Sequence, residues 1–164
     1  MRILGVDTAV HCTGVGVIDT AGQQARAVDY GCIRNPTGRT LSLSLQHLFT
    51  DIRNWVERTQ PDEIAIEGVF FCRNVKTAIS LGHARGAVIS ACGGIAAPIH
   101  EYSPRRIKQA VCGFGGAEKE QIKRMIMQLL ALAEPPSADA ADALAIAVCH
   151  WHAGRGIRAA DSKI

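Results

Sequence analysis

The sequence predicts an α/β protein: a mixed five-stranded sheet flanked by helices. Three short apolar runs separated by turn residues fill the first 33 positions, and helix-like and strand-like segments alternate after them. Such an alternation is typical of parallel strands joined by crossovers. The 164 residues suit one domain. We assign residues 1–154 to it and expect residues 155–164 to form a C-terminal tail.

The three N-terminal runs predict an antiparallel meander. Residues 3–6 are continuously apolar, as in a central strand that is covered on both faces. Residues 13–18 and 26–33 follow, with Ala21 and Gly22 as a turn between them. Because the connections are so short, consecutive strands are expected to pair antiparallel.

The middle of the chain predicts a helix, a strand and a second helix. Apolar residues recur with helical spacing from Leu41 to Trp55, and Pro61 ends that segment. Residues 63–67 read as a strand parallel to one of the first three. A second helix is expected over residues 76–92.

One stripe of that second helix contains only small residues, namely Ala78, Gly82, Gly86 and Ser90. Small residues let another helix approach closely. The partner helix could belong to the same chain or to a second copy, and the sequence leaves both interpretations open.

The last third predicts one more strand and three helices. Residues 98–102 form the strand, and Ser103 with Pro104 is a typical helix start. Apolar spacing marks a helix from Ile122 to Leu130. Ser137 caps the last helix.

Composition excludes several classes of protein. No run approaches the ~18 apolar residues of a membrane span, and Asp7 interrupts the apolar N-terminus, so we expect neither a membrane segment nor a signal peptide. The six cysteines form no C-x-x-C pair, which argues against structural zinc. We expect reduced thiols and a cytoplasmic protein. The net charge of +3 says little about nucleic acid.

Four carboxylates stand at unusual places. Asp7 and Glu67 each end an apolar strand, and neighbouring strands lie only ~4.8 Å apart. Two such charges repel each other unless a cation lies between them. Asp139 and Asp142 share one face of the last helix. Four carboxylates suit two Mg²⁺ ions, although acids also favour a helix N-terminus for its dipole alone, an alternative that applies best to Asp139.

Several motifs resemble the RuvC family of bacterial Holliday junction resolvases. The resemblance runs in order from about residue 2 to residue 153. It is carried by ILGVD with TGVGVI near the N-terminus, by AIEGVF and LGHARG in the middle, and by AEK and ADAADALAIA near the end.

The resemblance implies an RNase H-like fold, a homodimer and Mg²⁺-dependent nicking of four-way DNA junctions in recombination and repair. It implies two Mg²⁺ ions per active site, for which Mn²⁺ can substitute, and a branch-migration helicase as partner. Its catalytic and metal-binding positions fall on Asp7, Glu67, Asp139 and Asp142. Two basic positions near the scissile phosphate fall on Lys108 and Lys119, and an aromatic that contacts junction bases falls on Phe70.

The sequence departs from the family's pattern after the first strand. Where the family has Asp-Pro-Gly-Ser, this chain has Asp7-Thr8-Ala9-Val10. The carboxylate is kept, but a loop without proline and glycine is expected to adopt a different shape.

Further residues are candidates for contact with DNA. Phe70 and Phe71 are adjacent, so in an extended segment one can be buried while the other stacks on bases. Candidate phosphate contacts flank the acids, namely Arg73, Lys76, Arg105, Arg106, Lys108, Lys119, Lys123 and Arg124. His150 and His152 are two positions apart and share no helix face, which favours packing over a shared metal ion.

Three other classes of protein remain as alternatives. A non-catalytic junction-binding relative would keep the fold without the acids. An actin-like ATPase would need a second domain, for which 164 residues leave no space. Another RNase H-like nuclease would act on different substrates, such as RNA.

Overall fold

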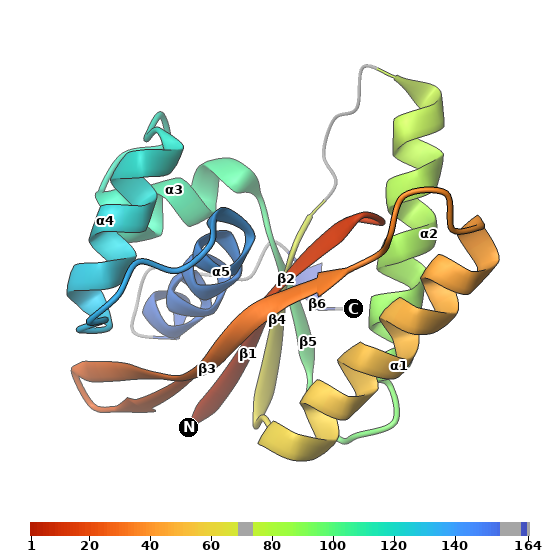
Figure 1. Ribbon diagram of the computed structural model, residues 1–164. Helices are drawn as coiled ribbons and strands as arrows, with labels where there is room; N and C mark the ends of the chain where they lie inside the picture. Colours follow the sequence, from red (N-terminus) through yellow and green to blue (C-terminus); the bar gives the residue numbers. More distant parts are fainter. Residues whose placement is uncertain (69–73, 155–161, 164) are drawn as a thin grey trace.

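The computed structural model describes residues 1–68 and 74–154, together with the backbone of residues 162–163. Helices pack on both faces of one six-stranded sheet with the order β3-β2-β1-β4-β5-β6 (Figure 1). The strands are β1 (Arg2–Asp7), β2 (Cys12–Ala21), β3 (Gln24–Arg34), β4 (Glu63–Glu67), β5 (Ile99–Tyr102) and β6 (Ser162–Lys163). The helices are α1 (Leu41–Thr59), α2 (Val75–Cys92), α3 (Pro104–Cys112), α4 (Lys119–Leu129) and α5 (Ala138–Ala153).

The predicted mixed sheet is confirmed and gains a sixth strand. β1, β2 and β3 form the antiparallel meander, β4 is parallel to β1, and β5 is parallel to β4. β6, which lies within the expected tail, pairs antiparallel with β5 at the edge of the sheet. Its two residues are too few to show a strand pattern in the sequence.

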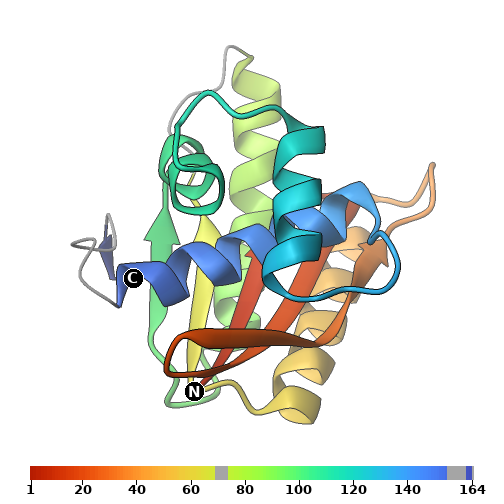
Figure 2. The same ribbon diagram turned by 90° about the vertical axis from the view of Figure 1, so that its left-hand side faces the viewer.

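The two faces of the sheet are covered by different helices. α1 and α2 pack on one face, while α3, α4 and α5 lie on the other, with α5 running across the strands (Figures 1 and 2). Strand alternation decides which side chains meet which helices. In β1, Leu4 and Val6 belong to the core under α1 and α2, whereas Ile3 belongs to the core around α5.

The face under α1 and α2 is a conventional aliphatic core. Leu48, Ile52 and Val56 of α1 are buried against it, as the helical spacing predicts. Leu41, the first residue of that predicted apolar face, is instead 43% exposed because it begins the helix. The small-residue stripe of α2 faces outward: Gly82 and Gly86 are exposed, and a Cβ added to either would meet no atom within 4 Å. Packing of the stripe within the described part of the chain is therefore ruled out.

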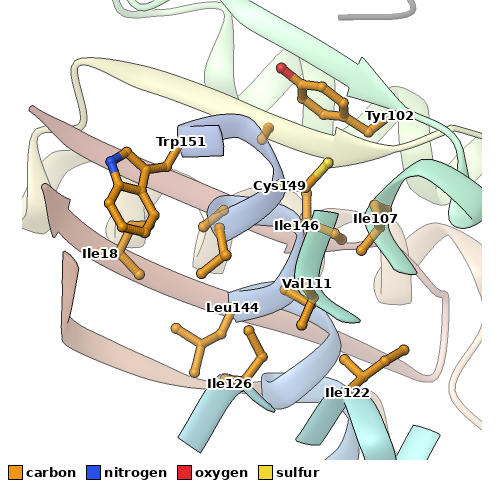
Figure 3. Close-up of a cluster of buried hydrophobic side chains, with 14 of the residues drawn as sticks. Ile18, Tyr102, Ile107, Val111, Ile122, Ile126, Leu144, Ile146, Cys149 and Trp151 are labelled. Carbon is orange, nitrogen blue, oxygen red and sulfur yellow. The ribbon is translucent and has the colours of Figure 1, made fainter. Parts of the chain in front are cut away.

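α5 lies directly on the backbone of the sheet. Glycines make this possible, because a Cβ at Gly5 would collide with the Ala143 carbonyl oxygen, and one at Gly16 would lie 2.8 Å from the Leu144 nitrogen. Gly5 and Gly16 are cross-strand partners, so together they open one flat seat for the helix. α3 and α4 cover the outer side of α5, where Ile122, Ile126 and Val111 join a cluster that ends at Trp151 (Figure 3).

Two absences concern the described residues alone. None of their helices is both long and apolar enough to cross a membrane. Five cysteines carry no disulfide, in keeping with the expected reduced thiols.

Candidate active site

Two of the predicted acids end neighbouring parallel strands. Asp7 is the last residue of β1 and Glu67 the last of β4. The register pairs Val6 with Ile66, so the two acids lie side by side one position further on. Both acids have the strand parity of residues facing α5, which directs their side chains under that helix.

α5 brings a third acid to the same place. Ser137 caps this helix by accepting a hydrogen bond from the Ala140 N–H, and Asp142 follows in the second turn. The Asp142 carboxylate accepts a hydrogen bond from Lys119 Nζ at 3.2 Å. Because α5 is seated on the glycines of β1 and β2, the height of Asp142 above the strand ends is fixed by backbone packing.

These groups line a cavity of about 240 Å³. Its polar lining consists of Asp7, Glu67, Asp142, Lys108 and Lys119. Pro104, Ile107, Ile122, Ala145 and Ile146 supply the apolar wall. Three carboxylates and two ammonium groups thus converge in one recess, from β1, β4, α3, α4 and α5.

The recess disfavours negative charge on the strand-end acids. Burial, together with the charges of Glu67 and Asp142, raises the pKa of Asp7 to about 7. Burial and the charge of Asp142 also raise the pKa of Glu67, while the two lysines act in the opposite direction. Its hydrogen bond to Asp142 raises the pKa of Lys119. A bound cation would relieve the repulsion among these carboxylates.

The fourth predicted acid, Asp139, lies near this recess but is turned aside. Its Oδ2 accepts a hydrogen bond from Cys12 Sγ at 2.9 Å, and Cys32 Sγ lies 3.9 Å from the same oxygen. Burial and the contact with Asp139 raise the pKa of the Cys12 thiol to about 12. The negative charge of Asp139 is still close enough to contribute to the raised pKa of Asp7. Nothing in the sequence indicates this contact between Cys12 and Asp139.

Hard oxygen donors in a partly buried recess fit magnesium. The four acids are spread more widely than a compact site for one ion. Within the described residues, three potential ligand atoms lie within 4.8 Å of one another in two other clusters, Cys12–Cys32–Asp139 and Glu63–His100–His150, and the four acids do not form a cluster of this kind. A wider spread is compatible with two ions held about 3.5–4 Å apart, because each carboxylate then serves a different ion or bridges both.

Arg85 is a positioning residue that the sequence showed only as part of the LGHARG motif. Its Nη1 donates to the backbone carbonyl of Glu67 at 2.9 Å, and its Nη2 lies 2.9 Å from a carboxylate oxygen of Glu101. Both side chains of this ion pair are largely buried. Arg85 therefore fixes the end of β4 where Glu67 leaves the sheet.

The unusual loop after Asp7 is held by polar side chains. Thr13 Oγ1 donates to the Ala9 carbonyl at 2.6 Å and accepts from the Ala9 N–H. Asn35 Nδ2 donates to the Val10 carbonyl at 2.7 Å. These bonds restrain a loop that contains neither proline nor glycine.

The remaining predicted residues are spread more widely. Lys76 is exposed in the first turn of α2, and Arg105 is exposed in α3. Neither lines the acidic recess. The predicted contacts of Phe70, Phe71 and Arg73 lie outside the described residues.

His150 and His152 have separate environments, as their spacing predicts. His152 Nδ1 lies 2.9 Å from the Ala110 carbonyl, whereas His150 is buried beside Glu63, His100 and Tyr102.

The sheet order, with acids at the ends of β1 and β4, defines the class of this protein, which has the RNase H-like fold. The family model described as crossover junction endodeoxyribonuclease RuvC matches residues 3–150. A protein of that name from Moorella thermoacetica is 45% identical over 92% of this chain and 90% of its own. Another protein of that name, from Shewanella sp. strain ANA-3, is 47% identical over 98% of this chain and 92% of its own.

Solved structures agree with this relationship. The structure of Thermus thermophilus RuvC matches with a TM-score of 0.86 and 30% identity, covering 94% of this chain and 96% of that one. T. thermophilus RuvC in complex with a Holliday junction substrate matches with the same TM-score and 28% identity, over the same shares of both chains. The chain belongs to the RuvC family of crossover junction endodeoxyribonucleases, which are hydrolases acting on DNA.

Proposed function

We propose that this protein resolves four-way DNA junctions by two symmetric nicks, in a Mg²⁺-dependent reaction that serves recombination and repair. The observation that carries the proposal is the recess in which Asp7, Glu67 and Asp142 meet Lys108 and Lys119, in a chain of the RuvC family.

Asp7, Glu67, Asp139 and Asp142 would hold two Mg²⁺ ions, for which Mn²⁺ would substitute. When bound, the pair of ions supplies an activated water and stabilises the leaving 3′ oxygen of the scissile phosphate. The fit of the acids to such ions is supported by the crowding that raises the pKa of Asp7 to about 7 without a cation. The products would carry a 5′-phosphate and a 3′-hydroxyl.

The two lysines act on the phosphate. Lys119 is held at Asp142 and Lys108 lines the same recess, so both ammonium groups stand beside the place where negative charge grows during cleavage. Charge offset by fixed groups in a partly buried site is stronger than in water. Lys119 also keeps Asp142 oriented before a phosphate binds.

A basic surface around the recess would bind the junction arms. Lys76 and Arg105 are exposed on α2 and α3, and Arg73 precedes α2 in the sequence. Contacts of this kind neutralise phosphates and weaken steeply with salt. Phe70 or Phe71 would stack on bases at the opened junction.

Two nicks require two active sites, and a twofold dimer supplies them. The outer face of α2 is a suitable interface, since Val75 is 73% and Ile79 is 55% exposed beside the outward-facing Gly82 and Gly86. A branch-migration helicase, as implied for the family, would act with the dimer. Sedimentation of a monomer at micromolar concentration would contradict the dimer.

Cleavage of synthetic substrates tests the function. A labelled four-way junction is incubated with the protein in Mg²⁺ or in EDTA, beside a linear duplex and an RNA duplex of matching sequence. We expect paired nicks in the junction in Mg²⁺ alone. Equal cleavage of the linear or RNA duplex would assign the chain to a different nuclease activity, and junction binding without cleavage would make it a non-catalytic relative.

A further inference from the structure

A second cluster of metal-ligand side chains lies at the opposite end of β4 from the acidic recess. Glu63 begins β4, His100 lies in β5 and His150 lies in the last turns of α5. Glu63 is four residues before Glu67, which corresponds to about 13 Å along a strand. The mechanism of strand cleavage uses none of these three side chains.

The ligand atoms of this cluster converge on one point. Nε2 of His150 lies 2.7 Å from Glu63 Oε2, and Nε2 of His100 lies 2.9 Å from the same oxygen. The three potential ligand atoms all lie within 4.8 Å of one another. Tetrahedral Zn²⁺ holds nitrogen and oxygen ligands at about 2.0–2.2 Å, so a small outward movement of the Glu63 carboxylate opens room for an ion.

The strand register places Glu63 and His100 on the same face of the sheet as α5. Ala65 pairs with His100 across β4 and β5, so His100 has the same strand parity as Ala65 and faces α5. Glu63 is two positions before Ala65 and shares that parity. The rings of His100 and His150 lie against each other, with their centroids 4.5 Å apart and their planes tilted by 39°.

A tyrosine orients one of the ligands. The Tyr102 hydroxyl lies 2.7 Å from Nδ1 of His150, on the side of the ring away from Glu63. A partner on one ring nitrogen fixes the imidazole and leaves the lone pair of the other nitrogen for a metal ion. Tyr102 is 1% exposed, so this orientation is held by the core.

His100 is the member of the cluster whose hydrogen-bonding capacity is least satisfied. It is 8% exposed, and within the described part of the chain neither ring nitrogen has a hydrogen-bond partner of good geometry. A buried polar group without a partner is costly. Coordination of a metal ion through Nε2 of His100 would satisfy that nitrogen, so that only Nδ1 would remain without a hydrogen bond.

We infer that Glu63, His100 and His150 form a binding site for one divalent transition-metal ion of the Zn²⁺ type, with Tyr102 as the residue that orients His150. Two imidazoles and one carboxylate suit Zn²⁺, whereas Mg²⁺ prefers oxygen ligands and does not compete for this site. The ion would join β4, β5 and α5 and so stabilise the fold. The absence of a C-x-x-C pair does not bear on a site without cysteine.

Metal binding by the purified, chelator-treated protein tests the inference. One equivalent of Zn²⁺ should bind and raise Tm by several degrees, in excess Mg²⁺ as well. Co²⁺ in place of Zn²⁺ should give the visible absorption of a tetrahedral nitrogen and oxygen site. Glu63→Gln and His100→Phe should each lose both signals, while His83→Gln, which changes an exposed histidine of α2, should keep them.

Three outcomes would overturn the inference. The wild type binds no Zn²⁺, or both variants bind it as the wild type does, or Co²⁺ gives thiolate charge-transfer bands that place it at Cys12, Cys32 and Asp139. Glu63→Gln changes one atom of a partly exposed side chain, so it remains informative if His100→Phe does not fold.

Discussion

The two faces of the central sheet are built on different principles. Under α1 and α2, β1 presents Leu4 and Val6 to a core of large aliphatic side chains. Under α5, the same strand presents Gly5 and ends in Asp7, and the helix rests on the backbone. Both faces bury apolar side chains, but only on the α5 face do glycines of β1 and β2 give up side chains and so bring a helix and its acids close.

This difference locates the chemistry. Alternation along β1 and β4 sends Asp7 and Glu67 to the α5 face, where Asp142 is held at a height set by glycines. On the α1 face, substitutions should change stability more than cleavage. At the glycines and strand-end acids of the α5 face, substitutions should change cleavage more than stability.

The largest effect is expected at Asp7. Asp7→Asn removes a charge but little volume, and junction cleavage in Mg²⁺ should fall by roughly 10³-fold or more because several kcal/mol of transition-state stabilisation are lost. Junction affinity, measured by gel shift in Ca²⁺, should stay close to wild type. Asp51→Asn on α1 is the matched control, and cleavage by Asp7→Asn at the wild-type rate would refute the assignment.

Gly14→Ala and Leu48→Ala test the contrast between faces directly. A Cβ at Gly14 would collide with the Asp139 carbonyl oxygen and lie 3.3 Å from Ala143 Cβ, so the start of α5 must move. Displacement of about 1 Å can cost roughly 10²-fold in rate. Leu48→Ala should cost about 2–5 kcal/mol in unfolding free energy and leave cleavage per folded molecule unchanged.

Chemical denaturation and single-turnover cleavage measure both quantities on the same samples. The proposed difference between the two faces of the sheet is refuted if Leu48→Ala lowers the cleavage rate of the folded protein as much as Gly14→Ala does.

Lys119→Gln should have a smaller effect. Loss of the ammonium group removes charge at the phosphate and the hydrogen bond that orients Asp142. We expect the single-turnover rate to fall by about 10–100-fold, with junction affinity changed little. Lys123→Gln lies about one turn further along α4 and outside the lining of the recess, so it serves as the control. Equal losses in both variants would indicate general phosphate binding.

The last prediction concerns the dependence of stability on pH and not the cleavage rate. Since the pKa of Asp7 is raised to about 7 in the folded state from its ordinary value of 3.8, the folded protein binds this proton more tightly than the unfolded chain does. Without metal, stability should therefore fall as pH rises from about 4 to 7 and then level off, by at most about 4 kcal/mol from this group.

Asp7→Asn should remove that slope, and Mg²⁺ at pH 8 should stabilise the wild type more than the variant. Urea denaturation across this pH range measures both effects. A wild-type profile that is flat, or that matches Asp7→Asn with and without Mg²⁺, would contradict the raised pKa.

Much of this fold follows from the sequence because its signals are local. Apolar runs, prolines and the Ser103 and Ser137 caps mark the elements, and parallel pairing of β1 and β4 brings Asp7 beside Glu67. The roles of Gly5, Gly14 and Gly16 could not be predicted from local patterns, because each glycine makes room for a helix more than a hundred residues away in the sequence. β6 has two residues and no pattern.

Contacts between distant side chains could not be predicted in the same way. Cys12 reaches Asp139 only because the β1–β2 turn lies beneath the start of α5. His150 lies beside His100 and Glu63 because of the β4–β5 register, while its sequence neighbour His152 faces α3. Arg85 reaches Glu67 from a helix whose sequence shows only small-residue spacing.

The central claim is that ions bind between β1, β4 and α5. Anomalous diffraction from crystals grown with Mn²⁺ and an uncleavable junction tests it most directly. We expect two peaks within reach of Asp7, Glu67 and Asp142, with Asp139 as the fourth ligand. A recess without peaks, or manganese held only beside Cys12 and Cys32, would contradict it.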